Sequence, residues 1–128
     1  MAKAIITQTA RMKMMKARAG AISLPKIVGM PFGTGGVNAS GTVLTPEISQ
    51  DSLNAEQMRK ELDGYEFLGD TSCRYSCTLA ASELAGKNIS EIALYDAEGD
   101  LVAIKNFSAK GKDDDLEMTF HIDDIFES

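Results

Sequence analysis

The single histidine and the two cysteines are the side chains best suited to act as nucleophiles, bases or metal ligands, and the sequence keeps them apart. His121 lies on the polar side of an alternating stretch that runs from Leu116 to Ile122. Cys73 and Cys77 fall on the other side of their own strand pattern from its polar residues. Because a Cys–His nucleophile needs the two groups in contact, the pattern predicts an exposed strand histidine instead.

The spacing of Cys73 and Cys77 excludes a disulfide between them. Four residues along a strand span about 13 Å, whereas a disulfide needs Cα atoms within about 7 Å. A zinc site is equally unsupported, because zinc takes four ligands and the chain has one histidine. We expect two reduced, half-buried thiols, as in a protein that folds in a reducing compartment.

The acidic residues form two groups that could hold a cation or move protons. Asp113, Asp114 and Asp115 are consecutive, whereas a calcium-binding EF-hand loop places acids at alternating positions around a glycine. The second group (Glu91, Asp96 and Asp100) surrounds an expected hairpin end, where acids are common. Both groups are interpreted as solvated turns, and no metal site is predicted.

Gly33-Thr34-Gly35-Gly36 opens a loop rich in Gly, Ser, Thr and Asn that runs to about Pro46. A phosphate-binding P-loop would end in Gly-Lys-Ser/Thr and lead into a helix, and this stretch does neither. The sequence therefore predicts no catalytic residues, no cofactor and no nucleotide, and the protein is not expected to be an enzyme.

Length and charge narrow the remaining classes. At 128 residues, with 44% hydrophobic and 25% charged residues, the chain is expected to form one globular domain. No apolar run approaches the roughly 18 residues that a membrane-spanning helix requires, so no membrane insertion is expected. A net charge of −6 argues against nucleic acid as a partner.

The charges are distributed unevenly along the chain. Residues 1–46 hold six bases and no acid, whereas the chain from Glu47 onward holds 19 acids and 7 bases. Either the basic head packs on the acidic body within one subunit, or the two meet between subunits of an assembly. Salt-dependent self-association would favour the second interpretation.

The first 46 residues predict a helix followed by extended chain. Residues 4–19 are strong helix formers and end at Gly20, a suitable C-terminal cap. Arg11 and Arg18 share one stripe of this helix, which is either a partner contact or a solvated face. Residues 22–32 contain two prolines and indicate an edge strand or short extended pieces.

The rest of the chain predicts one more helix and several strands. Residues 52–62 (SLNAEQMRKEL) suit a short helix. Residues 65–68 and 71–80 are typical of strands, and residues 89–107 predict a β-hairpin around the turn Asp96–Asp100. Alternation from residue 116 to residue 122 gives a final strand, followed by the apolar pair Ile125 and Phe126.

The fold class predicted from these elements is α+β. An N-terminal helix and a short second helix are expected to pack on an antiparallel sheet of four to six strands with a central hairpin. The domain is expected to be single, spanning 1–128, with a basic helical head at 1–20 and a β-rich body at 21–128.

Three stretches resemble one family, the N-terminal (tail-collar fibre) domain of bacteriophage tail-fibre proteins. The head is similar to that family's opening helix, extended segment and Gly-Thr-Gly-Gly. The second stretch, TPEISQDSLNAEQMRKEL, matches a Thr-Pro loop followed by a leucine, an acid and an arginine, here Leu53, Glu56 and Arg59. The third, NISEIALYDAEGDLVAIKNF, resembles the family's hairpin motif, with Ala93 in place of its usual glycine.

The resemblance implies a virion structural protein of a phage or prophage that is made in the cytoplasm of the bacterial host. It would be a non-enzymatic tail-fibre or baseplate attachment or adaptor module, because family members continue into a fibrous region and this sequence stops after the domain. Partners would be tail or baseplate proteins, and the assembly is expected to be a homo-oligomer, with a trimer favoured. Its expected interface residues are Arg11, Arg18, Ile125 and Phe126.

Two other classes remain open on the sequence. One is a small acidic regulator or inhibitor that binds a basic protein through the C-terminal acids. The other is a small enzyme or ligand-binding domain that uses the Gly33–Gly36 loop, which a deep polar pocket beside that loop would indicate.

Overall fold

The structure is a computed structural model that describes residues 4–126. Its elements follow the chain in the order β1 (Ile5–Ile6), α1 (Gln8–Arg18), β2 (Ile27–Gly33), β3 (Glu56–Glu61), β4 (Gly64–Gly69), β5 (Ser72–Leu79), β6 (Asn88–Asp96), β7 (Leu101–Gly111) and β8 (Met118–Ile125).

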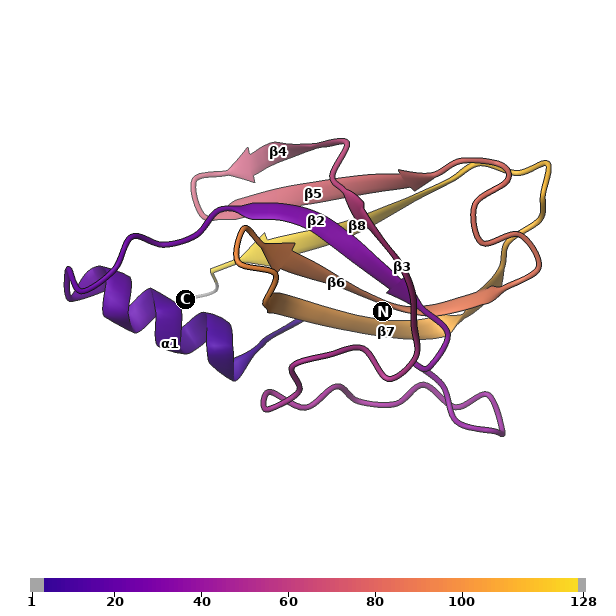
Figure 1. Cartoon of the computed structure of the whole chain (residues 1–128), viewed down its shortest axis with the longest axis horizontal. Helices are drawn as coiled ribbons and strands as arrows, with labels where there is room; N and C mark the ends of the chain where they lie inside the picture. The colour runs from indigo at the N-terminus through magenta and orange to yellow at the C-terminus, as the bar shows by residue number, and fades with distance from the viewer. Residues whose placement is uncertain (1–3, 127–128) are drawn as a thin grey trace.

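The strands form two antiparallel sheets (Figure 1). The larger sheet has the order β1-β7-β6-β2-β3, and the smaller has the order β4-β5-β8. The chain passes from one sheet to the other in the short link between β3 and β4. It returns to the larger sheet after β5 and finishes in the smaller one with β8.

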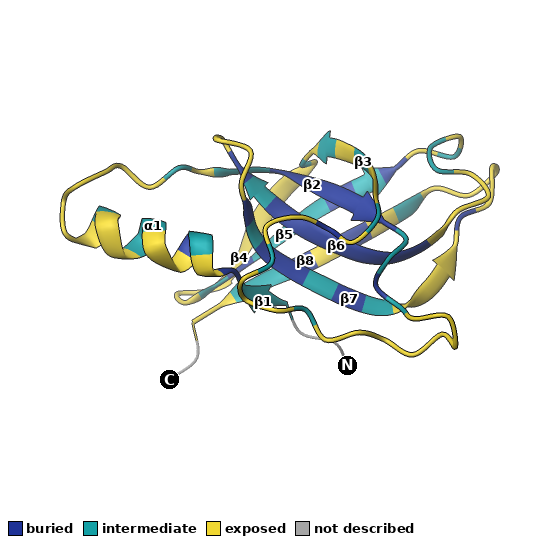
Figure 2. Cartoon of the chain, turned by 60° about the horizontal axis from the view of Figure 1, so that its bottom comes forward, coloured by how far each residue is buried: buried dark blue, intermediate teal, exposed yellow. Residues whose placement is uncertain are grey.

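The core lies between the sheets. Inward-facing residues of β2 and β6 meet those of β5 and β8, and the rings of Phe32 and Phe120 pack edge to face with centroids 5.2 Å apart. Alternation produces this arrangement, because every second residue of each strand faces the partner sheet. Figure 2 shows the buried residues concentrated in the strands, with the helix largely exposed.

The expected hairpin is confirmed. β6 and β7 pair in antiparallel register, with Ala93 opposite Ile104 and Leu94 opposite Ala103. In the turn, Gly99 has a φ of +87°, a conformation that glycine adopts without steric cost. The strands predicted at residues 71–80 and 116–122 are found at Ser72–Leu79 and Met118–Ile125, and they pair with each other.

The predicted α+β class with two helices is wrong. The described chain is 48% strand and has one helix, and it forms two sheets rather than one. The residues expected to form the second helix instead end a loop and form β3, which pairs along β2. The helix-forming side chains of Glu56–Glu61 express only a weak local preference, and pairing with β2 overrides it.

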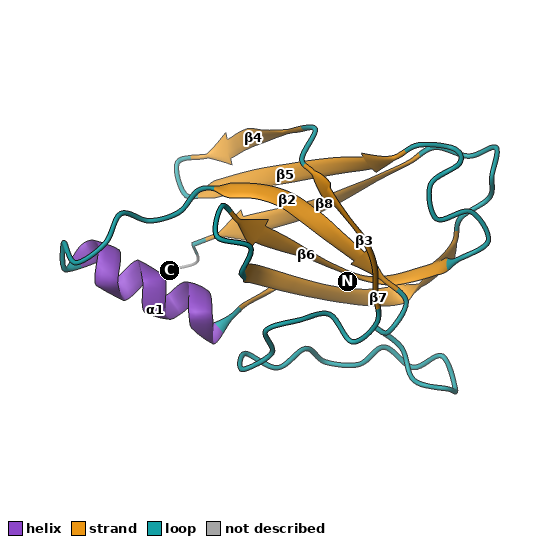
Figure 3. Ribbon diagram, in the orientation of Figure 1, coloured by secondary structure: helices purple, strands orange, loops and turns teal. Residues whose placement is uncertain are grey.

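Two segments lie outside the sandwich. The connection between β2 and β3, residues 34–55, is the long loop in Figure 3 and covers one side of the larger sheet through Leu53. α1 lies beside one end of the sandwich, near the β6–β7 turn. No helix in the described part of the chain is long and apolar enough to cross a membrane.

Candidate functional site

Glu91 is a fully buried carboxylate held by backbone N–H groups. On β6 it faces away from the core between the sheets, toward the ends of the long loop. Its Oε2 accepts hydrogen bonds from the N–H groups of Gly35 (2.8 Å) and Ala55 (2.7 Å), and its Oε1 accepts one from Asn54 (2.8 Å). The carboxylate therefore closes the base of loop 34–55, and its lone pairs are engaged in structure rather than available to a substrate.

The Glu91 contacts bring together the three stretches that resemble the phage family. Gly35 belongs to the first stretch, Asn54 to the second and Glu91 to the third. Gly36 adds a bond from its N–H to Ser90 Oγ (2.9 Å), and a Cβ at Gly36 would overlap the Ser90 carbonyl. Glycine is needed here because the two backbones touch.

The leucine and arginine of the second stretch also contact the hairpin. Leu53 packs with three hairpin residues, Ala93, Leu101 and Ile104. Arg59 lies over the Tyr95 ring, 4.6 Å from its centroid. The Arg59 guanidinium donates to the Gly99 carbonyl (3.0 Å) and pairs with Glu56 (3.1 Å).

Lys13 joins α1 to the β6–β7 turn. Its Nζ lies 2.6 Å from Asp96, 2.7 Å from Asp100 and 2.8 Å from Glu98. Desolvation lowers the pKa of Lys13, but hydrogen bonds to Asp100, Asp96 and Glu98 outweigh it and the net direction is upward. The three carboxylates are close enough together to hold a metal ion, but the Lys13 ammonium lies among them. The group is an internal ion cluster that fixes the helix.

His121 and the two cysteines lie on opposite faces of the smaller sheet. His121 is exposed, and its Nδ1 lies 2.8 Å from Ser76 Oγ on the outer face of the smaller sheet. Cys77 is buried on the inner face, and burial followed by the nearby Asp63 charge raises its thiol pKa to about 11. Cys73 and Cys77 are both free thiols.

The other sequence candidates are turns or anchors. The Gly33–Gly36 stretch directs the Gly35 and Gly36 N–H groups to β6, so they are not available to a phosphate. Asp113–Asp115 are exposed in the link to β8.

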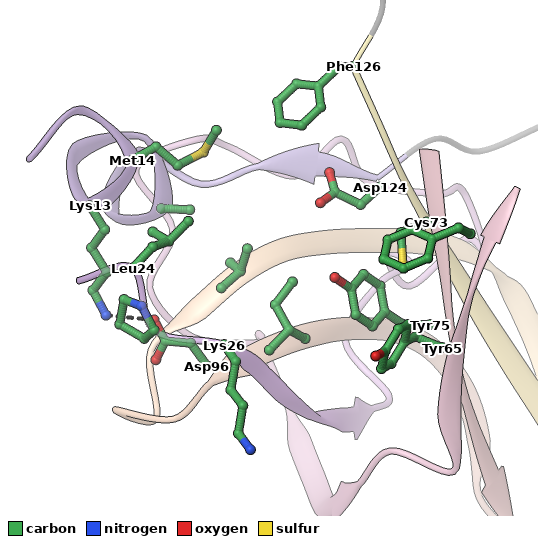
Figure 4. A pocket seen from close by; sticks show the side chains of 15 residues that line it. Lys13, Met14, Leu24, Lys26, Tyr65, Cys73, Tyr75, Asp96, Asp124 and Phe126 are labelled. Carbon is green, nitrogen blue, oxygen red and sulfur yellow. Dashed lines mark hydrogen bonds and ion pairs between the residues drawn. The ribbon is translucent and has the colours of Figure 1, made fainter. Parts of the chain in front are cut away.

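A groove lies at the end of the sandwich beside α1, with a volume of about 490 Å³. Aromatic side chains of the smaller sheet form one wall, Met14 and Leu24 form another, and Ile27 and Val102 of the larger sheet close the space (Figure 4). At this end the two sheets do not cover each other. The side chains of Tyr65 and Phe67 are therefore 65% and 72% exposed.

Asp124 places a carboxylate in this groove. In β8 it occupies the next inward position after Phe120 and Ile122, where alternation calls for an apolar residue. Among residues 4–126 its carboxylate makes no hydrogen bond or ion pair with a side chain. Burial raises the pKa of Asp124 because the charged form loses water.

The structure separates the four expected interface residues into two regions. Phe126 lines the groove and is 62% exposed, whereas Ile125 is exposed on the opposite side of the strand end. Arg11 and Arg18 lie on the exposed side of α1, and Arg11 Nε donates to the Ile6 carbonyl (3.2 Å).

Comparisons with models of known protein families, with curated proteins and with solved structures find no match to this chain.

Sequence reasoning missed the groove, Lys13 and the structural role of Glu91. Asp124 had a visible signal, because it interrupts the apolar series Met118, Phe120 and Ile122 at the next inward position. The Lys13 cluster left no signal in the sequence, since Lys13 and its partners Asp96 and Asp100 are 83 or more positions apart.

Proposed function

We propose that this chain is a structural protein of a phage or prophage tail, acting as a fibre or baseplate attachment or adaptor module. The observation that carries the proposal is the meeting of the three family-like stretches around Glu91. Family-like residues that lie far apart in the sequence contact one another in the fold. The resemblance therefore covers a connected part of the structure and not only separate short motifs.

The proposed role is non-enzymatic. The groove presents an apolar surface with one acid that has no partner among residues 4–126, rather than the convergent nucleophile, base and oxyanion donors that a hydrolase requires. The partners are tail or baseplate proteins together with further copies of the chain, with a trimer favoured. The location is the virion tail after synthesis in the host cytoplasm.

Mass spectrometry of particles purified from the host tests this role. We expect the chain to sediment with tail-containing particles at a fixed ratio to the other tail proteins. A Glu91→Ala variant should be incorporated less, and Glu117→Ala, the same change at an exposed position, should be incorporated normally. Intact particles that lack the chain in every gradient fraction would contradict the proposal.

A further inference from the structure

The groove beside α1 has the chemistry of a receptor for a positively charged side chain on an apolar support. Tyr65, Phe67 and Phe126 supply exposed apolar surface, and Asp124 supplies a carboxylate without a partner among the described residues. An unpaired charge on an apolar wall is unfavourable, and a cation placed against it would remove that cost.

The lysines that line the groove do not supply the cation. Lys13 is bound to Asp96, Asp100 and Glu98. In Figure 4 the nitrogen atoms of Lys13 and Lys26 both lie well away from Asp124. Within the described part of the chain, the Asp124 end of the groove therefore holds no cation that pairs with the carboxylate.

The exposed side of α1 has the complementary chemistry. Arg11, Met15 and Arg18 are spaced i, i+4 and i+7, so they form one stripe along the helix. Met15 is 65% exposed and the adjacent Met12 is 50% exposed. Methionine is well suited to contact surfaces because its unbranched side chain adapts to irregular partners.

This stripe cannot enter the groove of its own subunit. α1 directs Ala10, Lys13 and Met14 toward the groove, which leaves the Arg11–Met15–Arg18 stripe on the exposed part of the helix. A helix held in this orientation can offer the stripe only to another molecule.

We propose that the groove receives the Arg11–Met15–Arg18 stripe of a second copy of this chain, with an arginine of that stripe against Asp124. This inference rests on the homo-oligomer in the proposed function. Stripe and groove are different surfaces, so the contact is head to tail, and repetition closes a ring where the rotation permits. A trimer is one such ring.

Charge exchange tests the contact in solution. Asp124→Lys and the double variant Arg11→Glu/Arg18→Glu should each weaken self-association at least about tenfold in sedimentation equilibrium. The triple variant that combines them should recover most of the loss, because opposite charges face each other again. Asp114→Lys is the control, since it makes the same change near the other end of β8. The proposal would be overturned if the triple variant folds but does not recover self-association, or if the control loses as much self-association as Asp124→Lys.

Cysteine cross-linking tests which surfaces meet. Two proteins, Met15→Cys and Phe126→Cys, each also carrying Cys73→Ser, are mixed and oxidised with copper phenanthroline, which accepts the electrons released as two thiols form a disulfide. We expect a covalent dimer in the mixture and little in either protein alone, and Lys87→Cys in place of Met15→Cys should give none. Equal cross-linking of Met15→Cys alone would indicate a symmetric helix contact and overturn the proposal.

The outcome in assembled particles separates the two proposals. If Phe126→Cys in virions joins a different tail protein and never a second copy, the groove inference fails while the tail function stands. If the chain is missing from particles but the mixed disulfide forms, the tail function fails and the groove inference stands.

Discussion

Glu91 has a side chain of a type that can act in acid–base catalysis, but its environment gives it a structural role. A carboxylate buried without a cation is tolerable when several N–H groups are directed at it. Here three backbone donors from two distant parts of the chain meet it. The acid is needed because no neutral side chain accepts so many hydrogen bonds at one point.

Glu91→Ala should lower the free energy of unfolding by about 3 kcal/mol, because buried donors lose their charged acceptor. Urea denaturation followed by circular dichroism measures the change. Glu117→Ala removes the same group from an exposed position and should change stability by less than about 0.5 kcal/mol. Equal effects of the two substitutions would show that the Glu91 hydrogen bonds contribute nothing to stability.

Asp124→Asn should stabilise the isolated subunit at pH 7, by up to about 1 kcal/mol. Burial raises the pKa of Asp124 above its unfolded value. The folded state therefore favours the protonated form, and stability attributable to this group is lost as pH rises through its folded pKa. The amide removes that loss.

The pH dependence of this difference provides its check. The advantage of Asp124→Asn should shrink as pH falls through the folded pKa and the native carboxyl becomes neutral. Thermal unfolding of dilute protein between about pH 3 and 7 measures it. A constant difference across this pH range would exclude titration of Asp124 as the cause.

At the scale of elements, α1 depends on its connections rather than on its own length. Eleven residues are too few for a stable isolated helix, and Ala10 is its only fully buried residue. Thr7 caps its first turn by accepting a hydrogen bond from the Ala10 N–H (3.1 Å), and Lys13 fixes its middle to the β6–β7 turn.

Lys13→Ala should increase amide hydrogen exchange across residues 8–18 by about tenfold while the sandwich strands keep their protection, since only the helix loses its anchor. Hydrogen-exchange mass spectrometry resolves the two regions. Lys16→Ala, the same change on the exposed side of the helix, should leave exchange nearly unaltered. If the helix remains equally protected in both variants, the ion cluster is not its anchor.

Several strand positions were predictable from the sequence, because a half-buried strand alternates apolar and polar residues within its own short segment. This succeeded for β5, β6, β7 and β8. It failed for β3, whose Glu, Gln, Arg and Lys residues are typical of a helix. This segment is a strand only because β2 lies beside it. Pro31 also suggested an edge strand, yet β2 lies between β3 and β6, because one proline removes only one donor from the ladder.

The separation into two sheets, and with it the groove, depends on the chain crossing between β3 and β4, and no residue pattern marks that crossing. The prediction of Phe126 as an interface residue rests on the family resemblance and on its place in the apolar pair near the end of the sequence. Its position opposite Met14 across the groove required the three-dimensional structure.

For the whole molecule, the basic residues of the head fall into two groups, one paired within the subunit and one exposed. The ion pairs of Lys13 with acids of the β6–β7 turn agree with the interpretation in which the basic head packs on the acidic body of its own subunit. Arg11 and Arg18 remain on the surface, where they add positive charge to an otherwise acidic protein. The head is thus attached to its own body on one side and open to a neighbour on the other.

Self-association should weaken as salt rises from about 0.1 M to about 1 M, because the screening length shortens from about 10 Å to about 3 Å. Sedimentation velocity at fixed protein concentration measures the shift toward monomer. Asp124→Lys should show a smaller dependence, since it lacks the attraction that salt screens. Association that strengthens with salt would indicate that apolar contact dominates instead.

The closed base of loop 34–55 separates its tip from the rest of the protein. Glu91 holds both ends, while the tip turns tightly at Asn38, whose Oδ1 accepts hydrogen bonds from the Ser40 and Thr42 N–H groups. Ser40 and Gly41 are exposed, and nothing lies within 4 Å of a Cβ placed on Gly41. Foreign peptides inserted there would be displayed outward without disturbing the sheets, so evolution or an engineer could vary this tip freely.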